Sequence, residues 1–463
     1  MYYQKPSCLI INAAAVVTMD PQQPVQPNGY VYVQHGMIQA VGSCDDSEYA
    51  HLVAQEAHAL VINAAGKVVL PGLINTHHHL YQTLTRAYAP VMNAELFPWL
   101  QRLYPIWARL DEEAVRLGTL VGMAELMLSG CTTTADHHYV FPRGISTHAI
   151  DIQIEAATEL GMRFHACRGS MNLSQKDGGL PPDSVVQTEE EILKDSARLI
   201  KTYHDPSPGA MTQIAFAPCS PFSVTTDLMQ HTAALARENG VRLHTHLAET
   251  NDEEAFCLQR FGCRPLDYLE RVGWLHDSTW LAHGIHFSPE EISRLGAAGV
   301  GVAHCPSSNM RLGSGIAKIS ELQDAGVPVS LAVDGSASND ASHMLAEVRQ
   351  ALLLARLARG ADAMSVLEAF TLATLGGAAC LGRPDLGTLA PGKAADLAIF
   401  ALDDIGYSGA HDPVGALLLC HPARVDTLMV NGKIVVEQGH LTTLDLPPIL
   451  EAHRTKAHAL TTR

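Results

Sequence analysis

Short apolar runs that end in polar residues recur through the middle of the chain. Eight of them follow one another: VVLPGLINTHHH, TTTADHH, MRFHACRG, TQIAFAPCS, VRLHTHLAE, TWLAHGIH, VGVAHCPSSN and VPVSLAVDGS. Most are separated by segments that leave room for a helix and its loops, such as Glu112 to Ser129 and Asp227 to Asn239. Eight strand–helix repeats are typical of a (β/α)8 barrel. An open doubly wound sheet would normally carry a glycine-rich phosphate turn after its first strand, and here that strand ends in histidines. We therefore predict an α/β fold built on a (β/α)8 TIM-type barrel.

Both ends of the chain show a different pattern, in which β-type runs are joined by short turns. LIINAAAVVTMD and GYVYVQHGMIQAVG lie near the first residue, and LGTLAPGKAADLAIF and VDTLMVNGKIVVEQG lie near the last. Asn431-Gly432 is a strong type I′ hairpin signal. We expect the two ends to fold together as one small β-sandwich domain of residues 1–67 and 385–441, beside a barrel of residues 68–384 and a C-terminal tail of residues 442–463.

Composition and charge narrow the range of partners. The 463 residues are 47% hydrophobic and carry a formal net charge of -17, which argues against binding to nucleic-acid backbones or anionic membranes. No apolar run approaches the ~20 residues of a membrane span. The ten cysteines form no C-x-x-C pair, so we expect them to be reduced and the protein to be cytoplasmic. The expected partner is a small molecule. We also expect a homo-oligomer, although the apolar segment Ala351 to Leu357 suits a subunit interface or simply a barrel helix.

The ends of four predicted strands carry imidazoles and carboxylates. In a (β/α)8 barrel these ends face one mouth, so their side chains would converge there. The residues are His77 and His79 in the first run, His246 and Glu249 in the fifth, His283 in the sixth and Asp334 in the eighth. Three imidazoles and a carboxylate are the nitrogen and oxygen donors that a catalytic divalent metal needs. The chain holds 24 histidines, so a core or surface role is the better interpretation of any single one; their joint placement favours a metal site.

Other metal and phosphate motifs are absent from the sequence. There is no HExxH, no H-x-E paired with P-C-x-x-C, and no P-loop. The fourth run ends in Pro218-Cys219-Ser220 without a lysine that could bridge two metals, so one metal is expected. His78 interrupts the ligand pair and should point away from the metal on a regular strand. His244 has the same parity as His246, so strand geometry alone does not choose between them.

Four motifs resemble those of the amidohydrolase superfamily: PGLINTHHH, HLAE, AHG and DGSASN. They are most similar to its aminohydrolase branch, which includes guanine deaminase, S-adenosylhomocysteine deaminase and triazine hydrolases. Within the branch, LYQTLTRAYAPVMNAELFPWLQRLYPIWARL, SGCTTTADHHYVFPRG and RGSMNLSQKDGGLPPD most resemble members that act on 8-oxoguanine. The resemblance implies a hydrolytic deaminase of an aminoheterocycle, converting 8-oxoguanine to urate and ammonia. Hydroxy- or chloro-triazines, isoxanthopterin, guanine and S-adenosylhomocysteine are alternative substrates. A catalytically silent barrel that serves as a binding protein is the alternative of another class.

The resemblance also implies roles for the residues at the strand ends. His77, His79, His246 and Asp334 would hold one divalent metal, Zn²⁺ or alternatively Fe²⁺. Glu249 would take a proton from water and deliver it to a ring nitrogen. His283 would orient the water or the developing oxyanion, and Asp334 would pass a second proton to departing ammonia.

Four further residues are expected to contact the substrate, each with a structural alternative. The Gln82 amide would pair with a purine edge or, as a loop residue, with backbone. Arg168 would bind a substrate oxygen or form a structural salt bridge. Trp99 would stack on a planar heterocycle or pack in the core. His304, at the end of the seventh run, is a weaker substrate contact.

Overall fold

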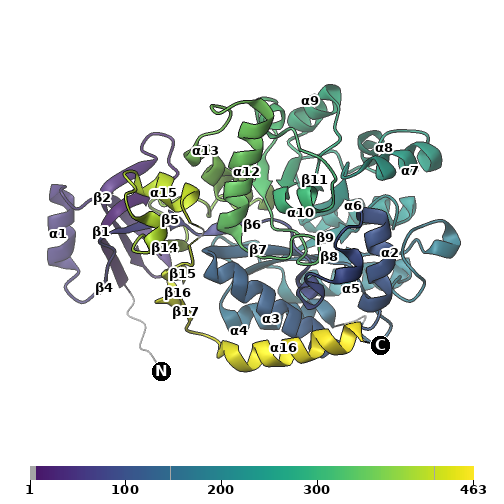
Figure 1. The fold of residues 1–463 in the computed structure, drawn as a ribbon, viewed down its shortest axis with the longest axis horizontal. Coiled ribbons are helices and arrows are strands. Elements are labelled where there is room, and N and C mark those ends of the chain that lie inside the picture. The colour runs from purple at the N-terminus through teal and green to yellow at the C-terminus, as the bar shows by residue number, and fades with distance from the viewer. Residues whose placement is uncertain (1–6, 146–147, 422, 463) are drawn as a thin grey trace.

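The computed structural model describes residues 7–145, 148–421 and 423–462, and their strands form two separate sheets (Figure 1). The first sheet has eight strands that lie side by side in chain order, and every neighbouring pair is parallel. These strands are β6 (Leu73–Asn75), β7 (Cys131–His138), β8 (Arg163–Ser170), β9 (Thr212–Pro218), β10 (Arg242–Leu247), β11 (Thr279–His283), β12 (Gly301–His304) and β13 (Val329–Leu331). Each of the eight apolar runs supplies one of them.

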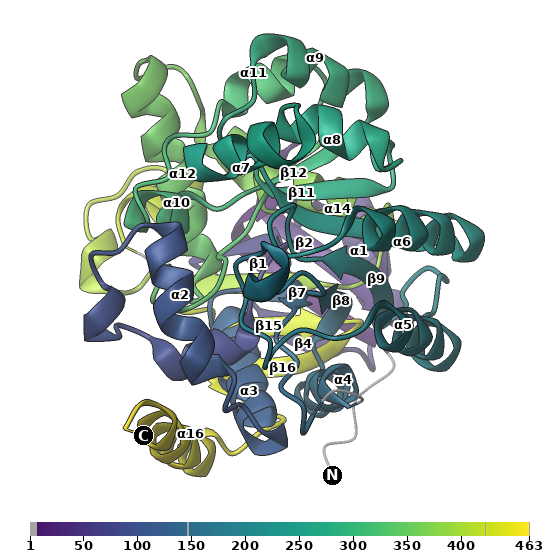
Figure 2. The same ribbon diagram turned by 90° about the vertical axis from the view of Figure 1, so that its right-hand side faces the viewer.

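The first and last strands of this sheet meet, which closes the barrel. The backbone N–H of Thr76, just after β6, donates to the carbonyl of Leu331 in β13 over 3.2 Å. Thr76 Oγ1 also lies 2.7 Å from Ser330 Oγ. Figure 2 looks at the barrel from the side opposite the second sheet and shows helices arranged around its strands. The predicted (β/α)8 barrel is confirmed.

Helices connect the barrel strands. They are α2 (Leu96–Trp107), α3 (Glu112–Leu128), α4 (Ala149–Leu160), α5 (Glu189–Tyr203), α6 (Thr226–Asn239), α7 (Asn251–Phe261), α8 (Pro265–Arg271), α9 (Pro289–Ala298), α10 (Pro306–Arg311), α11 (Ile319–Asp324), α12 (Met344–Arg359), α13 (Val366–Leu372) and α14 (Leu375–Leu381). Many begin where a short polar side chain accepts a hydrogen bond from the first turn, as Asp111 does for α3 and Thr225 for α6. The short 3-10 segments are η1 (Leu80–Thr85), η2 (Ala89–Val91), η3 (Gln175–Asp177) and η4 (Ile405–Tyr407).

The second sheet is mostly antiparallel and is built from both ends of the chain. Its strands are β1 (Ser7–Val17), β2 (Val25–Gln34), β3 (Met37–Ser43), β4 (Leu60–Asn63), β5 (Lys67–Pro71), β14 (Leu397–Ala401), β15 (Thr427–Val430), β16 (Lys433–Glu437) and β17 (His440–Leu441). The two ends join where β5 pairs antiparallel with β14. Asn431 and Gly432, between β15 and β16, have φ angles of 49° and 75°, as the expected type I′ turn requires. The helices α1 (Ser47–Gln55) and α15 (Pro413–Leu419) accompany this sheet.

The chain passes from one sheet to the other at Gly72. The apolar run VVLPGLIN is therefore two strands, because β5 pairs in the second sheet and β6 begins the barrel. A Cβ atom on Gly72 would lie 2.1 Å from Thr132 Oγ1, so only glycine lets the two chain segments approach this closely. This short crossover fixes where the residues that follow β6 enter the barrel mouth.

The last residues form a helix, α16 (Leu446–Thr461), that lies along α3 at the lower edge of the barrel (Figure 1). His453 on this helix is buried, with its Nε2 3.1 Å from Thr83 Oγ1 in η1. Residues 351–357 lie in α12, where Ala351 is buried and Leu357 is 78% exposed. None of the described helices is long and apolar enough to cross a membrane.

Candidate active site

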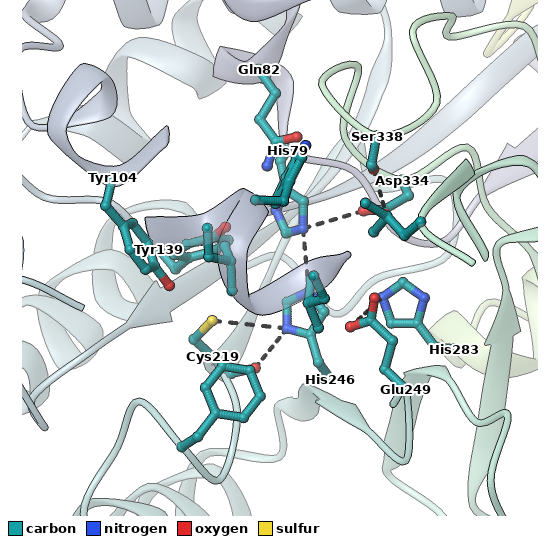
Figure 3. A pocket seen from close by; sticks show the side chains of 15 residues that line it. His79, Gln82, Tyr104, Tyr139, Cys219, His246, Glu249, His283, Asp334 and Ser338 are labelled. Carbon is teal, nitrogen blue, oxygen red and sulfur yellow. Dashed lines mark hydrogen bonds and ion pairs between the residues drawn. The ribbon is translucent and has the colours of Figure 1, made fainter. Parts of the chain in front are cut away.

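Four side chains converge at the mouth formed by the C-terminal ends of the barrel strands. His77 and His79 follow β6, His246 lies in β10, and Asp334 follows β13. Figure 3 shows His79, His246 and Asp334. Asp334 Oδ1 lies 3.3 Å from both His77 Nε2 and His79 Nε2, and His79 Nε2 lies 3.2 Å from His246 Nε2. Without a cation, this packing would press several lone pairs together in a buried space.

The hydrogen bonds of two of these imidazoles fix their tautomers. His79 Nδ1 lies 2.7 Å from the carbonyl oxygen of His137, and His246 Nδ1 lies 2.6 Å from that of Cys219. A carbonyl oxygen only accepts hydrogen bonds, so each Nδ1 carries the proton and each Nε2 presents a lone pair to the cluster. A backbone carbonyl behind a histidine is the usual arrangement around a metal ligand.

The third imidazole is fixed through a second histidine. His244 Nδ1 lies 2.9 Å from the carbonyl oxygen of Trp280, and its ring stacks on the indole with centroids 4.3 Å apart. Its Nε2 therefore accepts from His77 Nδ1, 2.7 Å away. The Nε2 of His77 is left buried and without a hydrogen-bond partner among the described residues. His244 and His246 thus both face the barrel interior, His246 in the cluster and His244 behind His77.

The carboxylate of Asp334 completes the donor set. Its Oδ2 accepts hydrogen bonds from Ser308 Oγ (2.6 Å) and Ser338 Oγ (3.2 Å), which turns Oδ1 toward the imidazoles. Burial disfavours the ionised carboxyl, but the close contact with His77 and the surrounding imidazoles hold the pKa of Asp334 well below its usual value. Burial lowers the pKa of His77 and His246, so these rings are neutral. Neutral imidazoles and an ionised carboxylate are the donors that a divalent metal binds.

Glu249 and His283 lie next to this cluster (Figure 3). Glu249 Oε2 is 3.4 Å from His283 Nε2, and His283 Nδ1 is 2.9 Å from Asn309 Oδ1. Burial raises the pKa of the Glu249 carboxyl to about 7. Burial disfavours the charged form of His283, yet the Glu249 and Asp334 carboxylates hold its pKa above the usual value. The pair can therefore share or exchange a proton near neutral pH.

Three residues at this mouth have a left-handed backbone that non-glycine residues rarely adopt. The φ angles are 55° at Ala248, 75° at His283 and 61° at Asp334. Each costs on the order of 1–2 kcal/mol, and such strain concentrates at functional sites. His283 would face the outer core, as Leu281 does, if β11 kept its regular alternation. The left-handed backbone at His283 breaks this alternation, so the imidazole lines the mouth instead.

The cluster forms one wall of a pocket that is otherwise lined mainly by apolar and aromatic side chains with a few polar groups, a lining usual for small-molecule sites. Other walls come from α2 and from loops after β7, β9 and α10. The lining side chains outside the cluster are Gln82, Leu96, Trp99, Leu100, Tyr104, Tyr139, Cys219, Phe222, Leu312 and Ser338. Sequence reasoning did not assign Tyr139, Phe222 or Leu312 to the site. Tyr139 directly follows β7, which is the one signal that could have indicated it.

Two of the four expected substrate contacts line this pocket. Trp99 is 3% exposed and its indole N–H donates to the carbonyl of Ala337 over 3.1 Å. The Nε2 of Gln82 is buried and has no hydrogen-bond partner among the described residues. Its Oε1 lies 3.4 Å from the backbone nitrogen of Ala337, a weak contact. Gln82 therefore lines the pocket with a buried amide that is only weakly engaged within the protein.

The other two expected contacts, Arg168 and His304, lie outside the pocket because strand alternation turns both away from the barrel interior. Arg168 alternates along β8 with Cys167, which belongs to the barrel interior, so the guanidinium faces the surrounding helices. There it pairs with Asp195 over 3.0 Å. His304 alternates in the same way with Ala303 and lines a separate cavity beside α11 and α12. In the structure Arg168 forms the salt bridge that was its alternative role, and neither Arg168 nor His304 is among the residues that line this pocket.

Replacing Arg168 with methionine is expected to lower the free energy of unfolding by about 3 kcal/mol, because it leaves a buried carboxylate with fewer partners. Arg198 still bonds Asp195, with Nε 3.0 Å from its Oδ1, which keeps the loss at the lower end for a buried pair. KM should change by less than about two-fold, since the guanidinium does not reach the pocket. Denaturant unfolding and steady-state kinetics measure both. A large rise in KM with unchanged stability would return Arg168 to the substrate.

The fold and this donor set define the class of protein: a (β/α)8 barrel whose mouth carries histidine and carboxylate donors suited to a divalent metal. Residues 68–435 match the sequence model of the amidohydrolase family. The chain belongs to the amidohydrolase family.

Several individual members of the family are similar to this chain over most of its length. The chain is 60% identical over 398 residues to 8-oxoguanine deaminase of Pseudomonas aeruginosa, which covers 86% of this chain and 88% of that one. It is 41% identical to hydroxydechloroatrazine ethylaminohydrolase of Pseudomonas sp. strain ADP, over 85% and 83% of the two chains. The crystal structure of atrazine chlorohydrolase from Arthrobacter aurescens TC1 complexed with zinc superposes with a TM-score of 0.91 at 35% identity, covering 98% and 99% of the chains.

Proposed function

We propose that this chain is a metal-dependent hydrolytic deaminase that converts 8-oxoguanine and water to urate and ammonia. The observation that carries the chemistry is the Glu249–His283 pair beside three lone-pair-bearing imidazoles and an ionised carboxylate. The substrate is supported by the 60% identity to 8-oxoguanine deaminase of Pseudomonas aeruginosa. The reaction replaces an exocyclic amine with a carbonyl, so one water enters and one ammonia leaves.

The residues that would hold the metal are His77, His79, His246 and Asp334. Their donor set fits Zn²⁺, and the zinc complex of the related atrazine chlorohydrolase supports this choice. A bound Zn²⁺ lowers the pKa of water to about 7 and so makes hydroxide available at neutral pH. A shared site is supported by the short distances between these donors: His79 Nε2 lies 3.2 Å from His246 Nε2, and Asp334 Oδ1 lies 3.3 Å from the Nε2 atoms of His77 and His79.

Glu249 would move the first proton. Its carboxylate, with a pKa raised to about 7 by burial, accepts the proton of the attacking water and delivers it to a ring nitrogen of the heterocycle. Water oxygen then bonds to the amino-bearing carbon, which becomes tetrahedral. His283, held by Asn309, faces Glu249 and would donate a hydrogen bond to the oxygen as negative charge develops there.

The tetrahedral carbon then loses ammonia. The second proton of the water passes by way of the Asp334 carboxylate to the amine, so that the leaving group departs as neutral ammonia. The electron pair left on oxygen closes the carbonyl of the product. No oxidant or further reactant is needed, because water supplies both protons and the oxygen.

Gln82 would recognise the heterocycle through its side-chain amide. Replacing it with methionine is expected to lower kcat/KM about 10- to 100-fold, because a substrate acceptor loses its donor in a buried pocket. The folded protein should lose no stability, since Nε2 has no partner to lose among the residues that the structure describes. Steady-state kinetics and thermal unfolding of Gln82→Met check both expectations. An unchanged kcat/KM would show that Gln82 does not contact the substrate.

Triazine hydrolysis is the second candidate, because the chain is 41% identical to hydroxydechloroatrazine ethylaminohydrolase. The two candidates differ in the leaving group, which is ammonia in one and an alkylamine in the other. A parallel assay of 8-oxoguanine, guanine, isoxanthopterin, S-adenosylhomocysteine and hydroxyatrazine separates them. The proposal expects the highest kcat/KM with 8-oxoguanine; rapid turnover of another compound beside negligible turnover of 8-oxoguanine would reject it.

A cytoplasmic location accompanies this proposal. The ten cysteines are free, and eight of them are buried. Buried free thiols are compatible with a reducing compartment, where structural disulfides are rare. The substrate is accordingly expected among the oxidised purines of the cell interior.

A further inference from the structure

The helix that follows Glu249 begins in an unusual way. Three other helices, α5, α9 and α13, begin with Ser or Thr at the N-cap and Glu three residues later. In each, the Glu carboxylate accepts a hydrogen bond from the backbone N–H of the N-cap itself, which is the ordinary capping box. The pairs are Glu191 with Thr188 (2.8 Å), Glu291 with Ser288 (2.7 Å) and Glu368 with Ser365 (2.6 Å).

The same sequence pattern opens α7, but its carboxylate bonds elsewhere. Thr250 is the N-cap and its Oγ1 accepts from the backbone nitrogen of Glu253, 3.4 Å away. The Glu253 carboxylate reaches past Thr250 into the preceding turn. Its Oε1 accepts from the N–H of Ala248 over 3.0 Å, and its Oε2 accepts from the N–H of Glu249 over 2.9 Å. Glu253 is fully buried, where bonds from N–H groups to a carboxylate are strong.

The turn held in this way is strained and joins two parts of the site. Ala248 has a φ of 55°. Its carbonyl accepts from the backbone nitrogens of Ile285 (2.9 Å) and His286 (3.0 Å), in the turn that follows His283. The peptide unit between Ala248 and Glu249 therefore connects the two turns: its carbonyl binds the turn that follows His283, and its N–H binds the Glu253 carboxylate.

We propose that Glu253 is a positioning residue for Glu249: its two hydrogen bonds hold the left-handed turn at Ala248 so that the Glu249 carboxylate faces His283. This inference rests on the proposed role of Glu249 in proton transfer. Glu253 does not line the pocket and does not contact the cluster. Its effect on catalysis would pass mainly through the orientation of Glu249, with a smaller contribution from its charge near His283.

Replacing Glu253 with glutamine removes one acceptor and places an amide NH₂ against a backbone N–H. We expect kcat to fall about 10- to 100-fold, as when orienting partners of functional side chains are removed, with KM and metal content unchanged. Glu291→Gln is the matched control, because Glu291 is also a buried N3 glutamate that bonds backbone N–H. Because Glu291 also pairs with Arg264, this variant should lower the melting temperature at least as much, while kcat stays within about two-fold.

A double-mutant cycle tests whether Glu253 acts through Glu249. In a Glu249→Gln background, adding Glu253→Gln should change the residual rate by less than about two-fold. Losses that multiply, or a wild-type kcat in Glu253→Gln, overturn the inference. If Glu253→Gln does not fold, Glu253→Asp serves, since its shorter side chain keeps the charge but cannot reach both N–H groups.

A crystal structure of the Glu253 variant gives a readout that needs no substrate. The inference expects the turn at Ala248 to leave the left-handed region and the Glu249 carboxylate to move away from His283. An unchanged turn overturns it. Failure of the proposed function would look different, because Glu249→Gln would then retain its activity or no heterocycle would release ammonia.

Discussion

Replacing Glu249 with glutamine is expected to lower kcat by about a thousand-fold or more, which is toward the upper end for a general acid–base group. Glutamine keeps the shape of the side chain but cannot accept a proton from water. His283 Nε2 lies 3.4 Å from Glu249 Oε2 in the wild type. In the variant His283 would lose the carboxylate that holds the pKa of its imidazole above the usual value. Ammonia release measured at high enzyme concentration quantifies the residual rate.

The controls for this variant are stability and metal content. Burial already penalises the ionised carboxyl of Glu249, so removing the charge should not lower the melting temperature. Metal content should also stay at the wild-type level, because the four proposed ligands are untouched. Deamination at the wild-type rate would disprove the proposed proton transfer.

Replacing His246 with alanine is expected to abolish metal binding under dilute conditions and to lower activity by more than about a thousand-fold. The change removes one of three imidazoles and frees the carbonyl of Cys219 that held it. Metal analysis after gel filtration, together with activity before and after adding Zn²⁺, measures the loss. Treating the wild-type protein with a chelator should reproduce it, and Zn²⁺ should restore activity to the wild type.

His304→Gln is the matched control for that variant. His304 also ends a barrel strand and is 2% exposed, but it faces the helices rather than the cluster. The control should retain its metal and its activity. Metal retention by His246→Ala, or metal loss by His304→Gln, would contradict the assigned ligand set.

The barrel and the cluster could be predicted from the sequence because both depend on local patterns. Each strand is a short apolar run, and the C-terminal ends of parallel strands meet at one mouth. Residues placed there by sequence alone, such as His77 and Asp334, do meet within 3.3 Å. What the pattern left open was the choice between His244 and His246. It depends on height in the barrel rather than on parity, since both rings point inward.

The substrate contacts were harder to predict because they depend on which face of a strand a side chain takes. Arg168 and His304 obey strand alternation and face outward, toward Asp195 and α12 respectively. By strand alternation His283 should also face outward, but its backbone φ of 75° turns the imidazole into the mouth. A left-handed residue at a strand end cannot be recognised from one sequence.

The pocket walls were unpredictable for a different reason. Phe222 and Leu312 are ordinary apolar residues in loops, and only the packing of α2 and α10 around the mouth brings them to the pocket. Glu253 looked like one more capping-box residue, since its spacing from Thr250 is the ordinary one. The direction of its carboxylate is set by the turn at Ala248, which local sequence does not reveal.

The most direct test of the proposed function is the product formed from 8-oxoguanine in water labelled with a heavy oxygen isotope. Mass spectrometry and an ammonia assay on the zinc-loaded protein measure the oxygen gained and the nitrogen lost. The proposal predicts urate that contains one oxygen from the solvent, with one ammonia released for each urate. Recovery of unchanged 8-oxoguanine, under conditions in which the same protein hydrolyses another heterocycle, would contradict it.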